Sequence, residues 1–269
     1  MIMLVYIMGF VSSKKKLVKE AVLLSLLEGA KNLSALTKDI DIVDTTVLHD
    51  LKQLTRSKLV SKLDGVYSLT SLGLIEAQIY KSYYLSSSIA EAYQDFWLNH
   101  DITGIPTNLM VNLWSIADST VIKSTPTNIG HVYTYFLSVL RSAKSIWGVS
   151  PIFHPDFVVA FREILDNGVK IQLVATHDVL KIFQEVGPDV LLKHVPSGNL
   201  QLFLNDNLKI ALTVTDKCFS LGLFDLNGDY DSNSDLVGEG EKALEWAYQL
   251  FESALKQSVP YECLAPKGE

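Results

Sequence analysis

The sequence predicts a two-domain protein of the mixed α+β and α/β classes. Two observations predict this fold class. Helical periodicity in the first part of the chain gives way near residue 57 to two short β-patterns, which a long helical pattern follows. After residue 144, strand and helix patterns alternate and then neighbouring strands follow, which is typical of a mixed, partly parallel sheet. The 269 residues are 48% hydrophobic and 20% charged, as in ordered globular chains of about two domains.

The helical pattern that ends near Ser57 is amphipathic. At about 100° per residue, Val47, Leu51 and Leu54 stack on one side of the predicted helix. The other side collects hydroxyls, amides, an imidazole and cations: Thr45, Thr46, His49, Lys52, Gln53 and Arg56. Side chains of these types reach base edges and phosphates when a helix lies in the major groove of DNA. The pattern therefore predicts a helix with one core face and one DNA-facing side.

A hairpin pattern follows this helix. Residues 59–63 and residues 66–69 have β-strand character, and Asp64-Gly65 between them is a two-residue hairpin signal. Lys62 lies in the first of these strands and is a further candidate for DNA contact. A polar-faced helix with a tight hairpin after it is typical of a winged helix-turn-helix, in which the hairpin is the wing.

The segments before this helix complete the same order of elements. Helical spacing predicts a first helix over residues 14–27 and a short second helix over residues 33–38, which Asn32 can cap. Residues 39–43 then form the turn, and Asp44 is the expected N-cap of the polar-faced helix. We therefore assign residues 1–71 to a winged helix-turn-helix DNA-binding domain.

The distribution of charge agrees with this assignment. The whole chain has a formal net charge of −7, which by itself argues against a nucleic-acid partner. Residues 1–70 hold 10 Lys and Arg against 7 Asp and Glu, whereas residues 71–269 hold 13 against 23. A slightly basic N-terminal module on an acidic body supports double-stranded DNA as the partner.

The first ten residues are apolar, but they do not have the layout of a signal peptide. Lys14, Lys15 and Lys16 follow the apolar run instead of preceding it, and ten residues are too few to span a bilayer. We interpret residues 1–10 as a strand or arm that packs on the domain, or as residues upstream of a start at Met8. Cys218 and Cys263 are the two cysteines, which suits a reducing, cytoplasmic setting without a membrane.

A long helical pattern leads out of the predicted wing. It begins at Thr70 or Ser71 and runs to Trp97, and we assign residues 72–98 to a linker or dimerisation helix. The alternative is that its apolar stripe packs on the second domain. Residues 99–106 contain turn-forming residues and mark the start of a C-terminal α/β regulatory domain over residues 99–269.

The C-terminal domain is predicted element by element. Helices are expected over residues 107–116, 128–142, 155–165, 177–185 and 239–256, and strands over residues 145–149, 169–175, 200–204, 209–214 and 219–224. Ligands of open α/β sheets gather beyond the carboxyl ends of parallel strands. Five residues near two such ends are therefore candidates for effector binding: Trp147, Ser150, His154, Thr176 and His177. The alternative is ordinary loop polarity.

Patterns for catalysis and for metal binding are not found in the sequence. There is no Walker loop, no G-x-G-x-x-G and no H-E-x-x-H, and residues 148–152 lack the last glycine of a nucleophile elbow. The six histidines have no metal-ligand spacing. Residues 225–235 resemble a calcium loop, but Tyr230 and Leu236 stand where an EF-hand needs glycine and glutamate. We interpret this segment as a turn with solvated carboxylates, and expect no catalytic residue, metal or cofactor.

Residues 67–73, after the predicted wing, are similar to many archaeal winged-helix regulators. Further on lie residues 97–101, 104–106, 148–152 and 223–231, with Trp246, Leu250 and Phe251, and these segments resemble the archaeal FilR-type methanogenesis regulators. The resemblance covers nearly the whole chain. The resemblance implies a winged-helix transcription regulator with a C-terminal regulatory domain similar to the phospholipase-D-like fold. Enzymes of that fold carry His-x-Lys motifs, and no histidine here has lysine two residues on. The apolar N-terminal arm departs from typical members.

These observations lead to one expected function and two alternatives. We expect an archaeal DNA-binding transcription regulator that acts as a homodimer and senses a small-molecule effector or partner through its C-terminal domain. One alternative is an enzyme that acts on a small molecule in the α/β domain. The other is an adaptor whose helix-turn-helix binds protein. Lys52 and Arg56 opposite the apolar face favour DNA over the adaptor.

Overall fold

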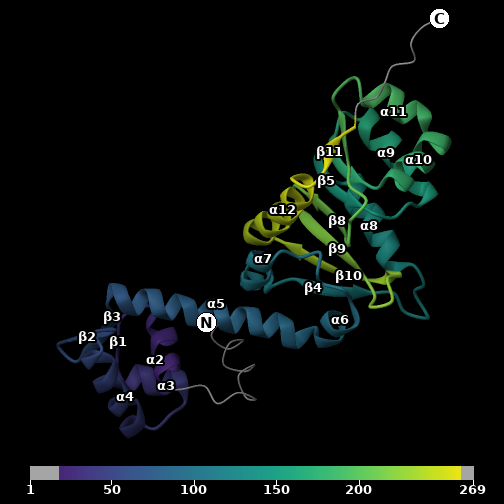
Figure 1. The fold of residues 1–269 in the computed structure, drawn as a ribbon. Helices are drawn as coiled ribbons and strands as arrows, with labels where there is room; N and C mark the ends of the chain where they lie inside the picture. The colour runs from purple at the N-terminus through teal and green to yellow at the C-terminus, as the bar shows by residue number, and fades with distance from the viewer. Residues whose placement is uncertain (1–17, 262–269) are drawn as a thin grey trace, which may run out of the picture. The chain divides into compact units, whose positions relative to one another are not determined.

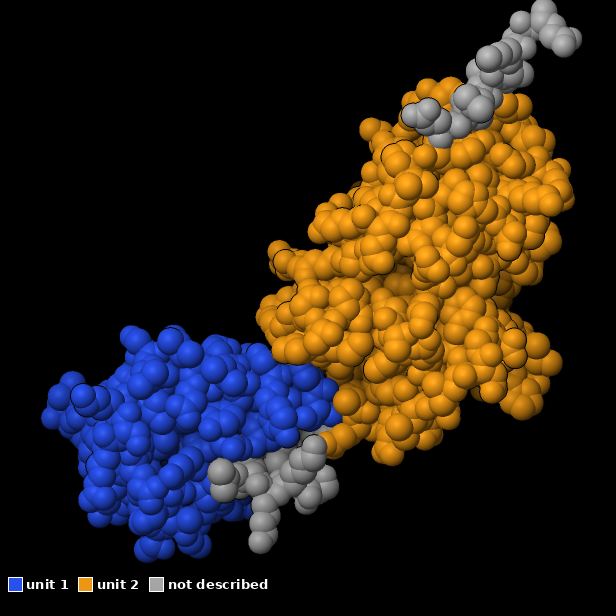
Figure 2. All heavy atoms as spheres, viewed as in Figure 1, with its two compact units in different colours: residues 1–88 blue, residues 89–269 orange. Residues whose placement is uncertain are grey.

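A computed structural model describes residues 18–261 of the chain. Its contacts divide the chain into two compact units, residues 1–88 and residues 89–269 (Figure 2). The division falls within the helix that follows the hairpin, so most of the predicted linker helix lies in the first unit. The predicted apolar arm and the first residues of the predicted first helix lie outside the described residues.

The first unit has the order of elements expected from the sequence (Figure 1). Its elements are α2 (Val18–Leu26), β1 (Lys31–Asn32), α3 (Leu33–Ile40), α4 (Asp44–Arg56), β2 (Val60–Leu63), β3 (Val66–Leu69) and α5 (Ser71–Ala92). The three strands form one antiparallel sheet in the order β1-β3-β2. Helix, short helix, helix and hairpin therefore confirm the predicted winged helix-turn-helix.

Helix α4 begins one residue before the expected position. Val43 is its N-cap, and the Val43 carbonyl accepts hydrogen bonds from the backbone N–H groups of Thr46 and Val47. The prediction of Asp44 as the N-cap is therefore wrong by one residue. Asp44 lies in the first turn instead, where a carboxylate interacts favourably with the positive end of the helix dipole. Asn32 does cap α3, because its side chain accepts a hydrogen bond from the Ala35 N–H at 2.9 Å.

The hairpin and α5 are joined by a tight local structure. Asp64 and Gly65 both have positive φ, as the two-residue turn between twisted strands requires. Thr70 then caps α5: its hydroxyl accepts the Gly73 N–H at 3.1 Å and donates to the Lys58 carbonyl at 2.6 Å. A Cβ on Gly73 would overlap the Leu59 carbonyl oxygen. A glycine at residue 73 therefore lets α5 begin directly against the base of the hairpin.

The core of the first unit is built from the apolar faces of its helices and hairpin. Val47 and Leu51 of α4 are fully buried and Leu54 is nearly so, together with Leu36 of α3 and Tyr67 of β3. Burial of one such aliphatic side chain stabilises the fold by about 1.5–3 kcal/mol. This packing fixes α4 with its opposite side directed to solvent.

The second unit is an eight-stranded mixed sheet with helices on both faces (Figure 1). Its strands are β4 (Thr120–Lys123), β5 (Ser145–Ser150), β6 (Lys170–Ala175), β7 (Leu200–Leu204), β8 (Ile210–Thr215), β9 (Cys218–Phe224), β10 (Tyr230–Glu239) and β11 (Val259–Pro260). The order across the sheet is β11-β7-β6-β5-β8-β9-β10-β4. Strands β5, β6 and β7 are parallel and the other pairs are antiparallel, which confirms the predicted mixed sheet.

The helices of this unit are divided between the two faces. They are α6 (Gln94–Asn99), α7 (Thr107–Val111), η1 (Leu113–Ile116), α8 (His131–Arg141), α9 (Pro155–Asp166), α10 (His177–Val186), α11 (Pro188–His194) and α12 (Glu241–Leu255). One core contains α12, where Trp246, Leu250 and Phe251 pack on β8 and β9, and Trp246 Nε1 donates to the Leu109 carbonyl of α7. The other core lies under α9, α10 and α11.

The largest differences from the sequence-based expectation lie at the edge of this sheet. Strands β4 and β10 and helix α11 were not predicted, and the segment assigned to a turn with solvated carboxylates is only partly a turn. Residues 225–229 do form the turn, whereas Asp235 lies in β10 and is 5% exposed. The prediction is therefore wrong for this carboxylate, because β10 pairs with β9 on one side and with β4 on the other.

The predicted long helix is also interrupted. Helix α5 ends at Ala92, Tyr93 has a non-helical backbone (φ −119°, ψ 38°), and α6 starts at Gln94. Neither α5 nor any other helix of the described residues is long and apolar enough to cross a membrane.

Candidate functional site

The first candidate site is the exposed side of α4. Thr45, Thr46, His49, Lys52 and Arg56 are exposed, while the opposite side of the helix is buried in the core. Within residues 18–261, no ion pair or hydrogen bond engages the side chain of Lys52 or of Arg56. Both cations are therefore available to an anionic partner.

The remaining predicted DNA-contacting residues lie beside this surface. Gln53 is half-buried, and its side-chain amide lies 3.2 Å from Nε2 of His49, which is one helical turn before it. Lys62 lies on the exposed side of the hairpin with its Nζ 5.1 Å from the centre of the Tyr67 ring. The ring holds the lysine by a cation–π contact and leaves its charge at the surface. Helix and hairpin thus both present cations.

The second candidate site is a cavity of about 330 Å³ in the second unit. Small-molecule sites have volumes of about 300–1,000 Å³. The cavity lies against the middle of the sheet, where β5, β8 and β9 place small side chains on one face: Gly148, Ala211, Thr213, Ser220 and Gly222. These residues pair across the strands, so their small size opens one continuous floor. Larger residues alternate with them and point into the α12 core.

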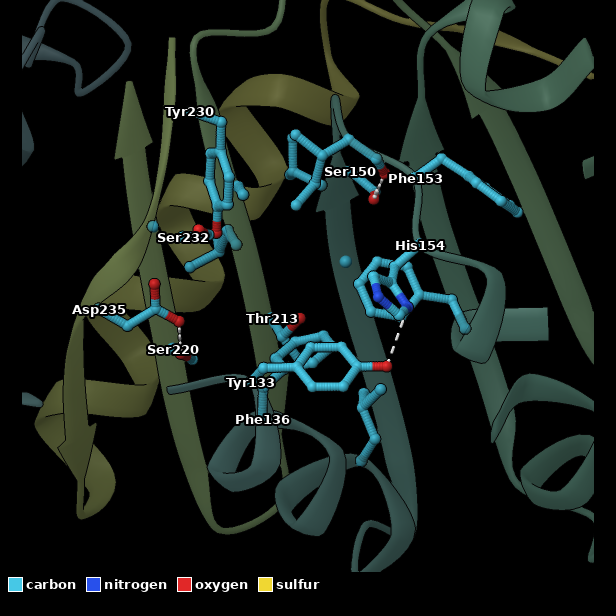
Figure 3. Close-up of a pocket in the computed structure, with 18 of the residues that line it drawn as sticks. Tyr133, Phe136, Ser150, Phe153, His154, Thr213, Ser220, Tyr230, Ser232 and Asp235 are labelled. Carbon is cyan, nitrogen blue, oxygen red and sulfur yellow. Dashed lines mark hydrogen bonds between the residues drawn. The ribbon is translucent and has the colours of Figure 1, made fainter. Parts of the chain in front are cut away.

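The cavity has apolar walls. Helix α8 contributes Val132, Phe136 and Leu140, and α9 contributes Phe157 and Phe161. Phe136 and Phe157 contact each other with ring centres 5.4 Å apart. Figure 3 shows the polar residues in two groups: Asp235, Ser220 and Tyr230 belong to β9 and β10, and Tyr133 and His154 lie across the cavity from Asp235.

Asp235 is the most unusual group of the cavity. Its Oδ2 accepts a hydrogen bond from the Ser220 hydroxyl at 2.6 Å, whereas its Oδ1 is buried without a hydrogen-bond partner in residues 18–261. Burial raises the pKa of this carboxyl to about 6; the Ser220 hydroxyl opposes the rise and the charge of Asp231 adds to it. The cavity therefore contains a carboxylate whose charge is poorly compensated by the protein.

The Tyr230 hydroxyl lies close to this carboxylate. A Cβ on Gly222 would overlap the Tyr230 hydroxyl and would approach Asp235 Oδ1 to 2.9 Å, which places both groups around the same glycine. Burial raises the pKa of Tyr230, and the charges of Asp235 and Asp231 raise it further. Tyr230 is therefore a neutral hydroxyl at physiological pH.

A second polar group lies at the other end of the cavity. The Tyr133 hydroxyl donates to Asp156 at 2.6 Å and lies 2.9 Å from His154 Nδ1. His154 Nδ1 also accepts the Asp156 N–H at 3.2 Å and so caps α9. An imidazole nitrogen that accepts this N–H carries no proton, so the neutral tautomer with the proton on Nε2 fits this geometry.

The structure separates the five residues that the sequence indicated for effector binding. Ser150 and His154 line the cavity. Trp147 packs on the opposite face of the sheet, edge-on to Tyr248 of α12 with ring centres 5.3 Å apart. Thr176 caps α10, and His177 pairs with Asp206 at 2.8 Å, and neither lines the cavity.

Sequence reasoning missed the β9 and β10 side of the cavity, although the sequence contains a signal for it. In β8 and β9, small residues alternate with large apolar ones, as in Ser220 and Gly222 between Phe219, Leu221 and Leu223. A strand of this pattern has one packed face and one face with free space. Asp235 can be recognised as a cavity residue only once β10 has been identified as a strand.

Neither unit brings together a metal-binding group in its described residues, where no three histidine, cysteine or acidic side chains are placed as common ligands. Asp225 accepts the N–H groups of Asn227 and Asp229 at 2.8 and 2.9 Å and so closes the turn. His100 is buried and bridges the Phe96 carbonyl and Asp231. These residues have structural partners of their own.

Comparison with known proteins places the two units in one family. Residues 6–88 match the family description "Methanogenesis regulatory protein FilR1, N-terminal domain", and residues 130–257 match its "middle domain". The chain is 31% identical over 223 residues to Methanogenesis regulatory protein FilR1 of Methanothrix harundinacea (strain 6Ac). The match covers 80% of this chain and 49% of that relative, so the chain spans about half the relative's length.

Two solved structures match this chain at low similarity. The archaeal chromatin protein TrmBL2 matches over 94% of this chain and 98% of its own, with 13% identity and a TM-score of 0.43. Phosphatidylserine synthase of Haemophilus influenzae Rd KW20 matches over 53% of this chain and 40% of its own, with 13% identity and a TM-score of 0.40. Similarity at this level carries no inference about function. The two family matches and the 31% identity, in contrast, show that the chain belongs to the FilR1 family of methanogenesis regulatory proteins.

Proposed function

We propose that this protein is an archaeal transcription regulator that binds double-stranded DNA through α4 and the hairpin. The exposed side of α4 is the observation that carries the proposal. Lys52 and Arg56 lie one turn apart, exposed and without a partner in residues 18–261, opposite three leucine and valine side chains in the core. Arginine pairs with guanine or clamps phosphate, and lysine neutralises phosphate.

The proposed reading surface extends over seven residues of α4 and the hairpin. Thr45, Thr46, His49 and Gln53 are short enough to touch bases from a helix in the major groove, whereas Lys62 on the hairpin would contact a neighbouring phosphate. Membership of the FilR1 family supports a regulatory role, and the name of the relative suggests genes of methanogenesis as targets.

We also propose that the protein acts as a homodimer through α5. Leu72, Ile75, Ile79 and Tyr83 follow one another at helical spacing and are 54%, 60%, 62% and 52% exposed. The other side of the same helix packs on α2, where the Tyr84 hydroxyl donates to Glu20. An exposed apolar stripe with this spacing is typical of helices that pair with a second copy.

A double substitution tests this dimer. Ile75→Glu with Ile79→Glu should convert a dimer into a monomer in analytical ultracentrifugation, because four carboxylates would enter the two-fold interface. Leu226→Glu is the matched control, since Leu226 is 71% exposed in the turn before β10. A parent protein that sediments as a monomer both free and on DNA would refute the proposal.

The cavity of the second unit is proposed as an effector site and not as an active site. It is a partly open, mainly apolar volume of the size that small ligands occupy. Its Ser220 hydroxyl donates to a carboxylate and has no imidazole beside it, so the serine is not activated as a nucleophile. The alternative is an enzyme that acts on a small molecule in this cavity, and turnover of a substrate would establish it.

The DNA-binding proposal is tested with the full chain and a random-sequence DNA library. Repeated selection should enrich one motif, and fluorescence anisotropy should then give a lower affinity for Lys52→Ala and Arg56→Ala by about 1–3 kcal/mol each. Lys181→Ala is the matched control, because Lys181 is an exposed cation of α10 in the other unit. If no sequence is enriched and the variants bind DNA like the parent, the adaptor alternative is favoured.

A further inference from the structure

The carboxylate of Asp235, on the β10 side of the cavity, indicates which class of ligand the cavity selects. Asp235 is only 5% exposed, and its Oδ1 has no hydrogen-bond partner in residues 18–261. A buried polar atom of this kind is costly unless a partner satisfies it. Figure 3 shows this carboxylate among the residues that line the cavity, so a bound molecule can supply the missing partner.

The charges around the cavity define that partner further. The ionisable residues of its lining are Tyr133, His154, Tyr230 and Asp235, and none of its described lining residues is a lysine or an arginine. Asp231, directly before Ser232 in the wall of the cavity, adds a second negative charge near Asp235. The potential at this end is therefore negative, which disfavours carboxylates and phosphates and favours a cation.

The rest of the lining selects for apolar surface. Aromatic and aliphatic side chains of α8, α9 and the sheet face one another across the cavity, with Phe136, Phe157 and Leu173 among them. Burial of apolar surface supplies affinity without direction, whereas the single carboxylate fixes orientation. Gly222 makes room for the Tyr230 hydroxyl at this end, because any side chain there would overlap that hydroxyl.

We propose that the cavity binds a mainly apolar small molecule whose protonated amine pairs with Asp235 Oδ1. This inference rests on the proposed function of the cavity as an effector site and names the chemical class of the effector. In this arrangement Ser220 holds the carboxylate through Oδ2 and leaves Oδ1 for the ammonium group. The Tyr230 hydroxyl, a neutral acceptor beside the carboxylate, provides a second contact for the same cation.

Three indole probes whose side chains differ in charge test the proposal by isothermal titration calorimetry on the full chain. Tryptamine carries the ammonium group, 3-ethylindole is the same molecule without the amine, and indole-3-propionate carries a carboxylate in its place. Tryptamine should bind the parent about tenfold or more tighter than 3-ethylindole, and indole-3-propionate should bind most weakly. Equal affinities, tighter binding of the carboxylate, or no binding of any probe at millimolar concentration would overturn the proposal.

Two substitutions assign the effect to one carboxylate. Asp235→Asn should remove most of the preference for tryptamine and keep the affinity for 3-ethylindole, which also shows that the cavity is intact. Asp178→Asn, at an exposed carboxylate of α10, should leave all three affinities unchanged. Loss of tryptamine binding in both variants, or in neither, would overturn the assignment to Asp235.

A DNA readout separates this inference from the proposed function. Tryptamine binding that depends on Asp235 but leaves the affinity for selected DNA unchanged would retain the ligand class and refute the effector role. A change of DNA affinity caused equally by 3-ethylindole and tryptamine would retain the effector role and refute the amine. Agreement of both readouts supports the two together.

Discussion

Replacing Asp235 with asparagine removes a buried negative charge while preserving the shape of the side chain. In the folded protein the carboxyl has a pKa of about 6, compared with the ordinary value of 3.8 in an unfolded chain. Burial, which disfavours the charged form, is the main cause. Each pKa unit corresponds to about 1.4 kcal/mol, so ionisation of this group lowers the free energy of unfolding by about 3 kcal/mol.

The sign and the pH range of the effect follow from these two values. Below pH 3.8 the carboxyl is protonated in both states and causes no penalty. Between pH 3.8 and about 6 the folded state binds more protons than the unfolded state, so stability decreases as the pH rises. Above pH 6 the full penalty is present. Asp235→Asn should therefore be more stable than the parent by about 1–3 kcal/mol at pH 8 and of nearly equal stability at pH 4.

Tryptophan fluorescence is the suitable assay for this prediction. All four tryptophans lie in the second unit, at Trp97, Trp114, Trp147 and Trp246, so their emission reports the unfolding of the unit that contains the cavity. Guanidinium titrations at a series of pH values give the free energy for parent and variant. Asp178→Asn serves as control. A variant that is no more stable than the parent at pH 8, or a difference that does not change with pH, would refute the reasoning.

Two further substitutions test the packing of the first unit. Gly73→Ala should destabilise it by about 1–3 kcal/mol or more, because the added methyl group would overlap the Leu59 carbonyl oxygen and displace the start of α5, and a lower melting temperature by circular dichroism is the readout. Leu51→Ala should destabilise it by about 2–5 kcal/mol, since the side chain is fully buried, whereas Lys52→Ala should stay within about 0.5 kcal/mol of the parent; equal melting of the two variants would contradict the assigned faces of α4.

The first unit could be predicted almost completely from sequence because its signals are local. The helical period of Val47, Leu51 and Leu54 defines the core face of α4, and Asp64-Gly65 defines the hairpin turn. The N-cap of α4 was predicted one residue too late, because a carboxylate in the first turn and a carboxylate at the N-cap give the same sequence pattern. The break at Tyr93 within the long helical run has no proline or glycine to mark it.

The cavity could be predicted only in part because it depends on pairing between distant strands. Ser150 is the last residue of β5 and His154 follows that strand, so the rule that ligands bind at strand ends could indicate both from sequence. Asp235 is different, since its burial requires β10 to lie between β9 and β4, and these two strands are far apart in the sequence. Its local sequence is polar and resembles a solvent-exposed turn. Tertiary pairing thus overrides local composition at this position.

The proposal that α4 reads DNA is tested most directly by the salt dependence of binding. The affinity of the parent for its selected DNA, measured by anisotropy over a series of salt concentrations, should fall steeply with added salt. In the Lys52→Ala/Arg56→Ala double variant the affinity should be lower, and the slope of log K against log salt should decrease by about one for each phosphate contact that is lost. The Lys181→Ala control should retain both the affinity and the slope of the parent. A double variant that melts like the parent and keeps the parent's affinity and slope would contradict the assignment of α4 as the DNA-binding helix.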